Sequence, residues 1–208
     1  MRAIGINQLL KKKYDTYDLG EVWTKHIGKP EKGGCINISG YSANGKTNFT
    51  IMLVKAFAKA GVKVDFNSFE EGHESTMQEV AIRHNLKDVS GKIIWLDRYN
   101  YKELDERLSK RNSAKVVVID SADDMQFTYA QFLKFKEKYP KKTFIVITKG
   151  TEKTGNPIWK QGEKIRFKCP IKITVRNFVA NIESRYGGNL NFIIRDKKPT
   201  SGDQLTLV

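Results

Sequence analysis

The chain has 208 residues, of which 39% are hydrophobic, which is enough for the core of one α/β domain but not for a second large domain. Lys and Arg number 37 against 23 Asp and Glu, giving a net charge of +14 that attracts polyanions. The two cysteines are too few for a disulfide framework or a zinc site. The sequence has no apolar stretch of ~18 residues and no signal-peptide pattern, so we expect a soluble, cytoplasmic protein that does not contact membranes.

The first 30 residues differ in composition from the rest. They are polar and are interrupted by Gly20, Gly28 and Pro30, so we predict that residues 1–30 form an arm with at most a short helix around residues 6–14. Residues 31–208 then form the predicted globular domain.

A phosphate-binding loop follows the first predicted strand, which covers residues 35–38. The sequence Gly40-Tyr-Ser-Ala-Asn-Gly45-Lys46-Thr47 matches the pattern G-x-x-x-x-G-K-[ST], and a helical pattern follows over residues 49–60. In such a loop the backbone amides surround the β-phosphate, the lysine reaches the β/γ oxygens and the hydroxyl ligates Mg²⁺. We therefore predict ATP and Mg²⁺ as cofactors. The predicted nucleotide contacts are Gly40, Ser42, Ala43, Asn44, Gly45, Lys46, Thr47 and Asn48, with Thr47 also a metal ligand.

Strands and helices alternate after this loop. Apolar runs predict strands over residues 62–69, 93–96, 115–120 and 143–148, with helical spacing between them over residues 75–84, 101–110 and 129–138. We expect a long loop from residue 150 to residue 170, followed by short alternating strands over residues 171–175, 177–182 and 190–194. The predicted fold class is α/β, with a mostly parallel central sheet flanked by helices and an antiparallel C-terminal extension.

Two acidic positions follow predicted strands, at the sheet edge where ligands bind in open α/β folds. Asp120 ends the most apolar strand and is expected to hold Mg²⁺ directly or through water. Glu70 follows the strand after the P-loop helix and is expected to orient and deprotonate an attacking water, with its neighbour Glu71 as the alternative.

This arrangement resembles the RecA/RadA/DnaB superfamily of P-loop ATPases. The resemblance covers about residues 20–195. It rests on Gly33-Gly34 and the P-loop, on Asn67-Ser68-Phe69-Glu70-Glu71, on the strand from Val116 to Asp120, on Ile147-Thr148-Lys149 and on Glu183-Ser184-Arg185-Tyr186-Gly187. It implies a RecA-like fold in which Glu70 is the catalytic base and Lys46 contacts the phosphates. It also implies that Arg185 reaches the γ-phosphate bound by a neighbouring subunit of a ring or filament. The chain looks most like a bare RadA-like core of the phage recombination type.

Two positions depart from the pattern of the superfamily. Glu183 stands where RadA has a lysine, and Lys149 stands where relatives often have a His or Gln that senses the γ-phosphate. Arg195 or Lys197 is the alternative source of a cation acting on the neighbouring subunit. These departures leave the rate of hydrolysis open.

The segment from Gly150 to Pro170 combines cations with aromatic side chains. Cations neutralise phosphates and aromatic rings stack on bases, a combination suited to single strands without strong sequence preference. The superfamily also has its DNA-binding loops in this region. We expect this segment to contact single-stranded DNA, with RNA as an alternative ligand. The non-functional alternative is that the segment is a solvated insertion. The predicted contacts are Lys153, Trp159, Lys160, Lys164, Arg166 and Lys168.

Three functions are compatible with these residues. The first is a homo-oligomeric, ATP-hydrolysing protein that acts on single-stranded DNA in recombination, repair or replication. The second is a DnaB-type helicase motor, and the third is a nucleotide-gated binding or regulatory module with little hydrolysis. The third is motivated by Glu183 and Lys149.

Overall fold

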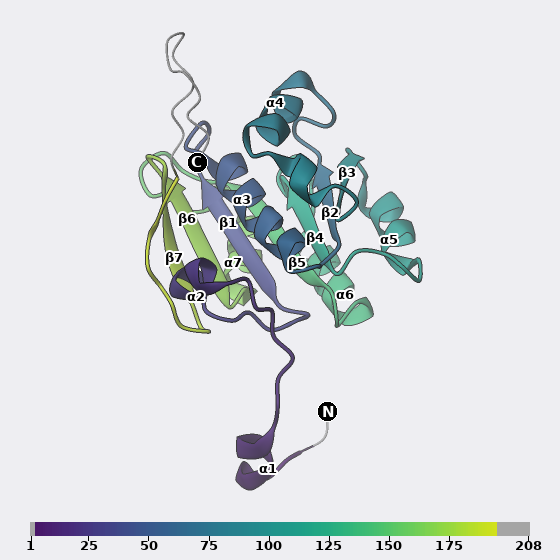
Figure 1. Ribbon diagram of the computed structural model, residues 1–208, viewed down its shortest axis with the longest axis vertical. Coiled ribbons are helices and arrows are strands. Elements are labelled where there is room, and N and C mark those ends of the chain that lie inside the picture. The colour runs from purple at the N-terminus through teal and green to yellow at the C-terminus, as the bar shows by residue number, and fades with distance from the viewer. Residues whose placement is uncertain (1–2, 195–208) are drawn as a thin grey trace.

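The computed structural model describes residues 3–194, and an eight-stranded sheet forms its centre, as Figure 1 shows. The strand order is β3-β2-β4-β5-β1-β6-β7-β8. The strands are β1 (Cys35–Gly40), β2 (Val64–Ser68), β3 (Ile93–Asp97), β4 (Val116–Asp120), β5 (Thr143–Lys149), β6 (Ile171–Arg176), β7 (Val179–Ser184) and β8 (Phe192–Ile193). Strands β1 to β6 are parallel to one another, and antiparallel pairing begins at β7. The predicted α/β class is confirmed.

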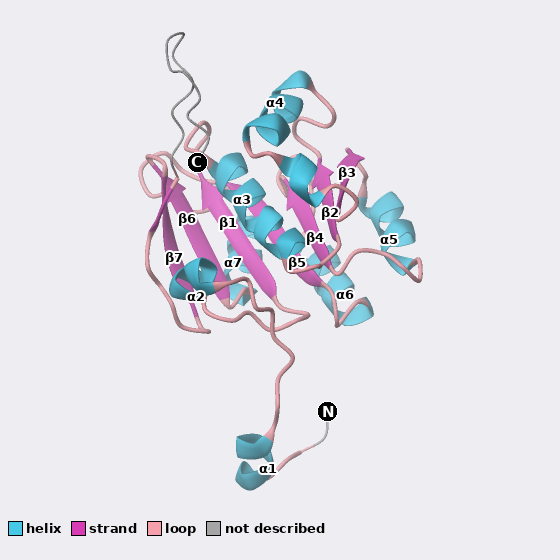
Figure 2. Ribbon diagram, viewed as in Figure 1, coloured by secondary structure: helices cyan, strands magenta, loops and turns pink. Residues whose placement is uncertain are grey.

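Helices cover both faces of this sheet (Figure 2). One face carries α2 (Glu21–Ile27), α3 (Lys46–Lys59), α4 (Ser75–Arg83) and the short 3₁₀ helix η1 (Leu86–Val89). The other face carries α5 (Tyr101–Ser109), α6 (Tyr129–Lys138) and α7 (Lys160–Lys168). The sequence therefore predicts every element between residues 35 and 149 except η1, with ends that differ by a few residues.

The alternation of strand side chains produces two hydrophobic cores. In β4, Val116 and Val118 pack towards α3, whereas Val117 and Ile119 pack towards α5 and α6. All four side chains are fully buried, and each contributes roughly 1.5–3 kcal/mol relative to an exposed position. A strand that is apolar on both faces belongs in the middle of a parallel sheet, which is where β4 lies.

Only the beginning of the predicted arm stands apart from the body. Helix α1 (Ile6–Lys11) has no buried residue, and in Figure 1 it lies well away from the sheet. The chain joins the body where Thr16 pairs with Glu31. Beyond that point Trp23 and Ile27 are buried against the α3 side of the sheet.

Helix α2 is absent from the sequence prediction because two glycines flank it. Gly20 and Gly28 have φ of +87° and +69°, values that favour glycine, and they stand at the two ends of the helix. Gly20 and Gly28 therefore cap a seven-residue helix, and the segment between them is not unstructured.

The prediction of one long loop over residues 150–170 is wrong for its second half, which forms α7. Only Gly162 and Ile165 of this helix are buried, so its apolar periodicity is too sparse to be recognised.

Among residues 3–194, no helix has both the length and the apolar character needed to span a membrane.

Candidate functional site

Two glycines shape the loop between β1 and α3. Gly45 has φ +94° and stands directly before the first residue of α3. A Cβ on Gly40 would lie 2.4 Å from the carbonyl oxygen of Val175, so only glycine allows β6 to approach here. Within residues 3–194, the turn and loop hydrogen bonds of the backbone do not use the amides of residues 42–47 as donors. These amides and the amino end of α3 form a surface that suits an anion.

Lys46 begins α3 and turns back over the loop. Its Nζ donates to the carbonyl oxygen of Tyr41 at 2.9 Å. Burial lowers the pKa of Lys46, while the nearby charges of Glu70 and Asp120 act in the opposite direction. The structure therefore brings these three predicted residues into one electrostatic cluster.

The two acidic residues are held together through the backbone. Ser68, the last residue of β2, is the register partner of Asp120 at the end of β4. The amide of Glu70 donates to the carbonyl oxygen of Asp120 at 3.0 Å, which fixes the turn after β2. Burial raises the pKa of Glu70. Burial, and after it the charge of Glu70, raises the pKa of Asp120 to about 7.

Asp120 is a buried carboxylate at the end of β4. The residue is 7% exposed, and no side chain in the described part of the chain donates a hydrogen bond to its carboxylate. A buried ionised carboxylate without a partner is costly, and a cation would relieve that cost. Thr47 lies in the first turn of α3 beside the free loop amides. A carboxylate and a hydroxyl next to a phosphate-binding loop fit Mg²⁺.

Lys149 adds a positive charge to this cluster. The sequence alone does not show which residues its side chain contacts. It is the last residue of β5 and the register partner of Gly40. Its Nζ lies 2.6 Å from Asp124 Oδ1 and 3.8 Å from Glu70 Oε1. The hydrogen bonds from Lys149 and Ser121 outweigh burial and lower the pKa of Asp124. The ammonium group therefore lies between a loop carboxylate and the predicted base.

Another contact on the P-loop comes from the turn between β6 and β7. Asn44 Oδ1 accepts the amide of Asn177 at 2.7 Å, and a Cβ on Gly45 would lie 2.9 Å from the ring of Phe178. No sequence pattern signals this contact, because it joins residues more than 130 positions apart through the pairing of β1 with β6.

Arg185 lies at the opposite end of the sheet from the P-loop. Its amide donates to the carbonyl oxygen of Pro170 at 3.0 Å, next to the start of β6, whereas the P-loop follows the end of β1. Because β1 and β6 are parallel, the two sites are separated by the length of a strand, roughly 17–20 Å. Arg185 is exposed and does not join the cluster of its own chain. The alternative residues Arg195 and Lys197 lie outside the described residues.

The predicted nucleic-acid contacts divide into two groups. Lys153, Lys160, Lys164 and Lys168 are exposed, and Trp159 is partly buried next to α7. Arg166 instead points into the protein, with a side chain that is 12% exposed. Its guanidinium donates to Thr174 Oγ1 at 2.9 Å and, over longer distances, to Asn37 and Ser39 of β1. The structure therefore separates Arg166 from the exposed lysines.

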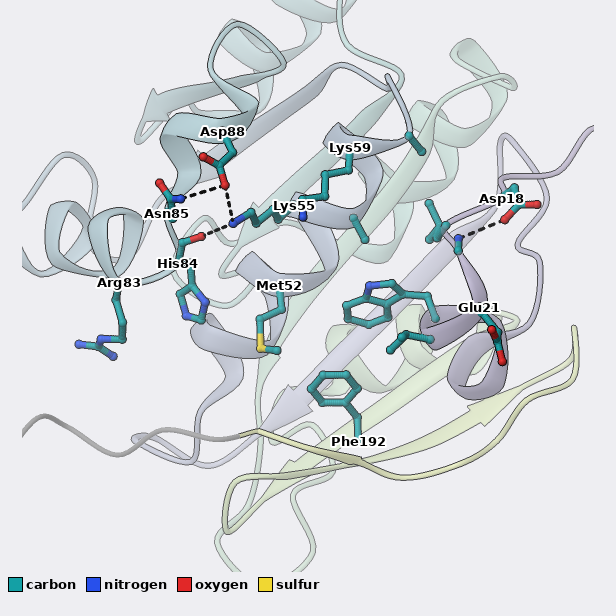
Figure 3. A pocket seen from close by; sticks show the side chains of 16 residues that line it. Asp18, Glu21, Met52, Lys55, Lys59, Arg83, His84, Asn85, Asp88 and Phe192 are labelled. Atoms are coloured by element: carbon teal, nitrogen blue, oxygen red, sulfur yellow. Dashed lines mark hydrogen bonds and ion pairs between the residues drawn. The ribbon is translucent and has the colours of Figure 1, made fainter. Parts of the chain in front are cut away.

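A separate groove of about 910 Å³ lies between α2, α3 and η1, away from the P-loop (Figure 3). Its floor is apolar, with the ring of Trp23 stacked on Phe192 at 5.3 Å and Met52 beside them. Lys55 on its rim donates to the carbonyl oxygen of His84 at 2.7 Å and pairs with Asp88 at 3.6 Å. None of the predicted site residues lines this groove.

No protein-family model matches the sequence, and no curated protein matches it. Solved structures do match the fold. The KaiC-like protein PH0186 of Pyrococcus horikoshii OT3 superposes with a TM-score of 0.59 at 19% identity, over 83% of this chain and 90% of that chain. The flagellar accessory protein FlaH of Methanocaldococcus jannaschii gives a TM-score of 0.62 at 18% identity, over 88% of this chain and 96% of that chain.

The fold is RecA-like. The resemblance to RecA-like P-loop ATPases that the motifs indicated is thus confirmed at the level of the fold. In this RecA-like domain the P-loop, Glu70 and Asp120 meet at the carboxyl ends of β1, β2 and β4, the edge where open α/β sheets bind their ligands.

Replacing Asp120 by Asn should increase the free energy of unfolding above neutral pH. The folded-state pKa of Asp120, about 7, lies above its ordinary value of 3.8. The favourable contribution of this carboxyl group is therefore complete below its unfolded pKa and is lost as the pH rises through about 7. We expect urea unfolding to give Asp120→Asn a gain of about 1–3 kcal/mol over the wild type at pH 8 and much less at pH 4.

The matched control is Glu137→Gln, on an exposed position of α6. It should change the free energy of unfolding by less than about 0.5 kcal/mol at either pH. An equal gain for Asp120→Asn at both pH values would contradict a buried, ionised Asp120.

Proposed function

We propose that this protein binds ATP with Mg²⁺ and hydrolyses it while acting on single-stranded DNA in recombination, repair or replication. The observation that carries the proposal is the convergence of Lys46, Glu70 and Asp120 around a P-loop with unpaired amides. Three residue types that ATP hydrolysis needs, a phosphate-binding cation, a metal ligand and a base, thereby occupy one edge of the sheet.

Each residue has a role that its position supports. Lys46 would contact the β- and γ-phosphates in place of the carbonyl oxygen of Tyr41, and Thr47 and Asp120 would hold Mg²⁺, which neutralises phosphate charge. Glu70 would orient the attacking water and accept its proton. The raised pKa of Glu70, caused first by burial, makes its carboxylate a better proton acceptor near neutral pH.

The exposed face of α7 supports nucleic-acid binding. Lys160, Lys164 and Lys168 are four residues apart, so they form one row along the helix. Beside the row, the side chain of Phe167 is 79% exposed, and the ammonium of Lys172 lies 5.4 Å from the centre of its ring. Such a row can neutralise successive phosphates while an aromatic ring stacks on a base. Lys153 precedes α7 in an exposed loop.

Two features favour assembly into a homo-oligomer. Arg185 cannot serve the P-loop of its own chain from the opposite end of the sheet, so a role at the γ-phosphate requires a second subunit. Helix α1 carries exposed Ile6, Leu9 and Leu10 at the spacing of one apolar stripe. A six-residue helix with such a stripe is not stable alone in water, and exposed apolar stripes of this kind mark association surfaces.

One observation favours the nucleotide-gated module as the second candidate. The ammonium of Lys149 lies 3.8 Å from Glu70, and an ion pair with the base opposes proton transfer to it. Glu183, where the superfamily pattern has a lysine, is paired instead with Arg166 at 3.8 Å. ATP that binds tightly without turnover, with or without single-stranded DNA, would select this function.

Replacing Lys46 by Ala should weaken ATP binding about 100-fold, because charge-assisted contacts to the phosphates are lost. Binding of a fluorescent ATP analogue measures this effect directly. Lys59→Ala is the matched control, since it removes an exposed lysine at the other end of α3 and should bind normally. Equal affinity in Lys46→Ala and the wild type would reject this P-loop as the nucleotide site.

Replacing Arg185 by Ala should leave ATP binding intact and reduce hydrolysis about 100-fold or more, as loss of an arginine finger does. Mixing Arg185→Ala with Lys46→Ala should restore part of the activity. In mixed oligomers the intact P-loop of the first variant meets the intact arginine of the second. Arg111→Ala, in the exposed loop before β4, is the control that should remain fully active. If Arg185→Ala hydrolyses ATP at the wild-type rate, Arg185 is not the finger.

Replacing Lys160, Lys164 and Lys168 together by Gln should weaken binding to a single-stranded DNA oligonucleotide. The slope of log affinity against log salt concentration should become shallower by about 2, since each lost phosphate contact contributes ~0.7. The matched control changes three other exposed lysines, Lys63, Lys87 and Lys92, to Gln; all three lie outside α7. An RNA strand of the same sequence tests the alternative ligand. Equal losses in the two triple variants would mean that net charge, and not α7, governs binding.

A further inference from the structure

The two cysteines of the chain meet in the second hydrophobic core. Cys35 is the first residue of β1, and Cys169 follows the last residue of α7. They are brought together because β1 and β6 are paired, with Ile36 opposite Ile171. Figure 1 shows β1 next to β6 in the body of the molecule, with α7 behind these strands. The chain has no other cysteines, so each thiol has only one intramolecular partner.

The contacts of the two thiols are close and well defined. Cys35 Sγ donates to the carbonyl oxygen of Lys168 at 3.9 Å, an oxygen that belongs to the peptide group joining Lys168 to Cys169. Cys35 and Cys169 also belong to the same buried cluster of side chains. Cys35 is 4% exposed and Cys169 is fully buried.

The two thiols differ in their surroundings. Lys136 Nζ donates to the carbonyl oxygen of Gly34 at 3.0 Å, directly before Cys35. The neighbouring Cys169 side chain, and after it the charges of Lys136 and Lys168, lowers the pKa of Cys35 despite burial. Burial raises the pKa of Cys169. Cys35 also keeps 4% exposure, whereas Cys169 is fully buried, so Cys35 is the sulfur that a small oxidant in solution reaches first.

We propose that Cys35 and Cys169 are a peroxide-reactive pair that forms a reversible disulfide between the start of β1 and the end of α7. Cys35 loses its proton to solvent, and its thiolate attacks one oxygen of hydrogen peroxide. The O–O bond breaks, leaving a sulfenic acid on Cys35 and hydroxide. Cys169 then attacks the oxidised sulfur, and its proton leaves with the sulfenic oxygen as water. In total, two thiols are oxidised to a disulfide and one peroxide is reduced to two waters.

The disulfide would fix α7 to the sheet. It would join residues 134 positions apart (169 − 35), so it would restrict the unfolded chain strongly. We expect the melting temperature of the oxidised protein to rise by about 10 °C, and a reductant to reverse this rise. This inference is independent of the nucleotide site and of the proposed function.

The experiment treats the full chain with hydrogen peroxide, blocks remaining thiols under denaturing conditions and digests the product with trypsin. Cleavage after Lys32, Lys46, Lys168 and Lys172 releases each cysteine in its own peptide. The expected product is a linked pair of peptides, residues 33–46 joined to residues 169–172, in monomeric protein. Free thiols in the native protein under conditions that fully oxidise free cysteine would overturn the proposal. A disulfide between two chains would overturn it as well.

Two variants separate the roles of the sulfurs. In Cys169→Ala the charges of Lys136 and Lys168 remain next to Cys35, and peroxide should produce a sulfenic acid on Cys35 that dimedone traps because no second thiol is left to react with it. In Cys35→Ala, Cys169 should resist peroxide because it is buried and protonated. Dimedone labelling of Cys169 in Cys35→Ala at the rate seen for Cys35 would overturn the assignment of Cys35 as the attacking residue. The peptide map of the wild type does not depend on either variant folding.

Discussion

The position of β1 between β5 and β6 is the constraint on which the site depends. On one side the amide of Gly150 donates to the carbonyl oxygen of Gly40 at 2.8 Å, and on the other the carbonyl oxygen of Val175 occupies the space that a Gly40 side chain would need. The end of β1 is therefore held between the end of β5 and β6 at the point where the P-loop begins. Because both partners are parallel to β1, they bring Lys149 and the β6–β7 turn to the same edge.

Charge balance is the second constraint at this edge. Glu70, Asp120, Asp123 and Asp124 lie near Lys46 and Lys149, so carboxylates outnumber ammonium groups. The raised pKa values of Glu70, Asp120 and Asp123 reflect burial first and mutual repulsion in part. Addition of Mg²⁺ would compensate the carboxylates, and a polyphosphate would then engage Lys46 and the loop amides. This excess of carboxylates beside the P-loop would suit a metal–nucleotide complex.

Local motifs made much of the fold and the centre of the site predictable. The P-loop, the apolar strand ending at Asp120 and the position of Glu70 each depend on a short stretch of sequence, and the parallel sheet brings their ends together. The partners of Lys149 and the contact of Asn177 with Asn44 depend on strand pairing across the sheet, which a single sequence does not encode locally. Helices α2 and α7 were missed because glycine caps and charged residues concealed their spacing.

Arg166 connects the two surfaces that the proposed function requires. It stands on α7 between the exposed lysines, yet its guanidinium bonds to Asn37 and Ser39 of β1 and to Thr174 of β6. Strand β1 continues directly into the P-loop. A ligand that displaced α7 would act on these hydrogen bonds and, through them, on the strand that carries the phosphate-binding loop. Under the proposed function, this arginine would link nucleic-acid binding on α7 to nucleotide binding at the sheet edge.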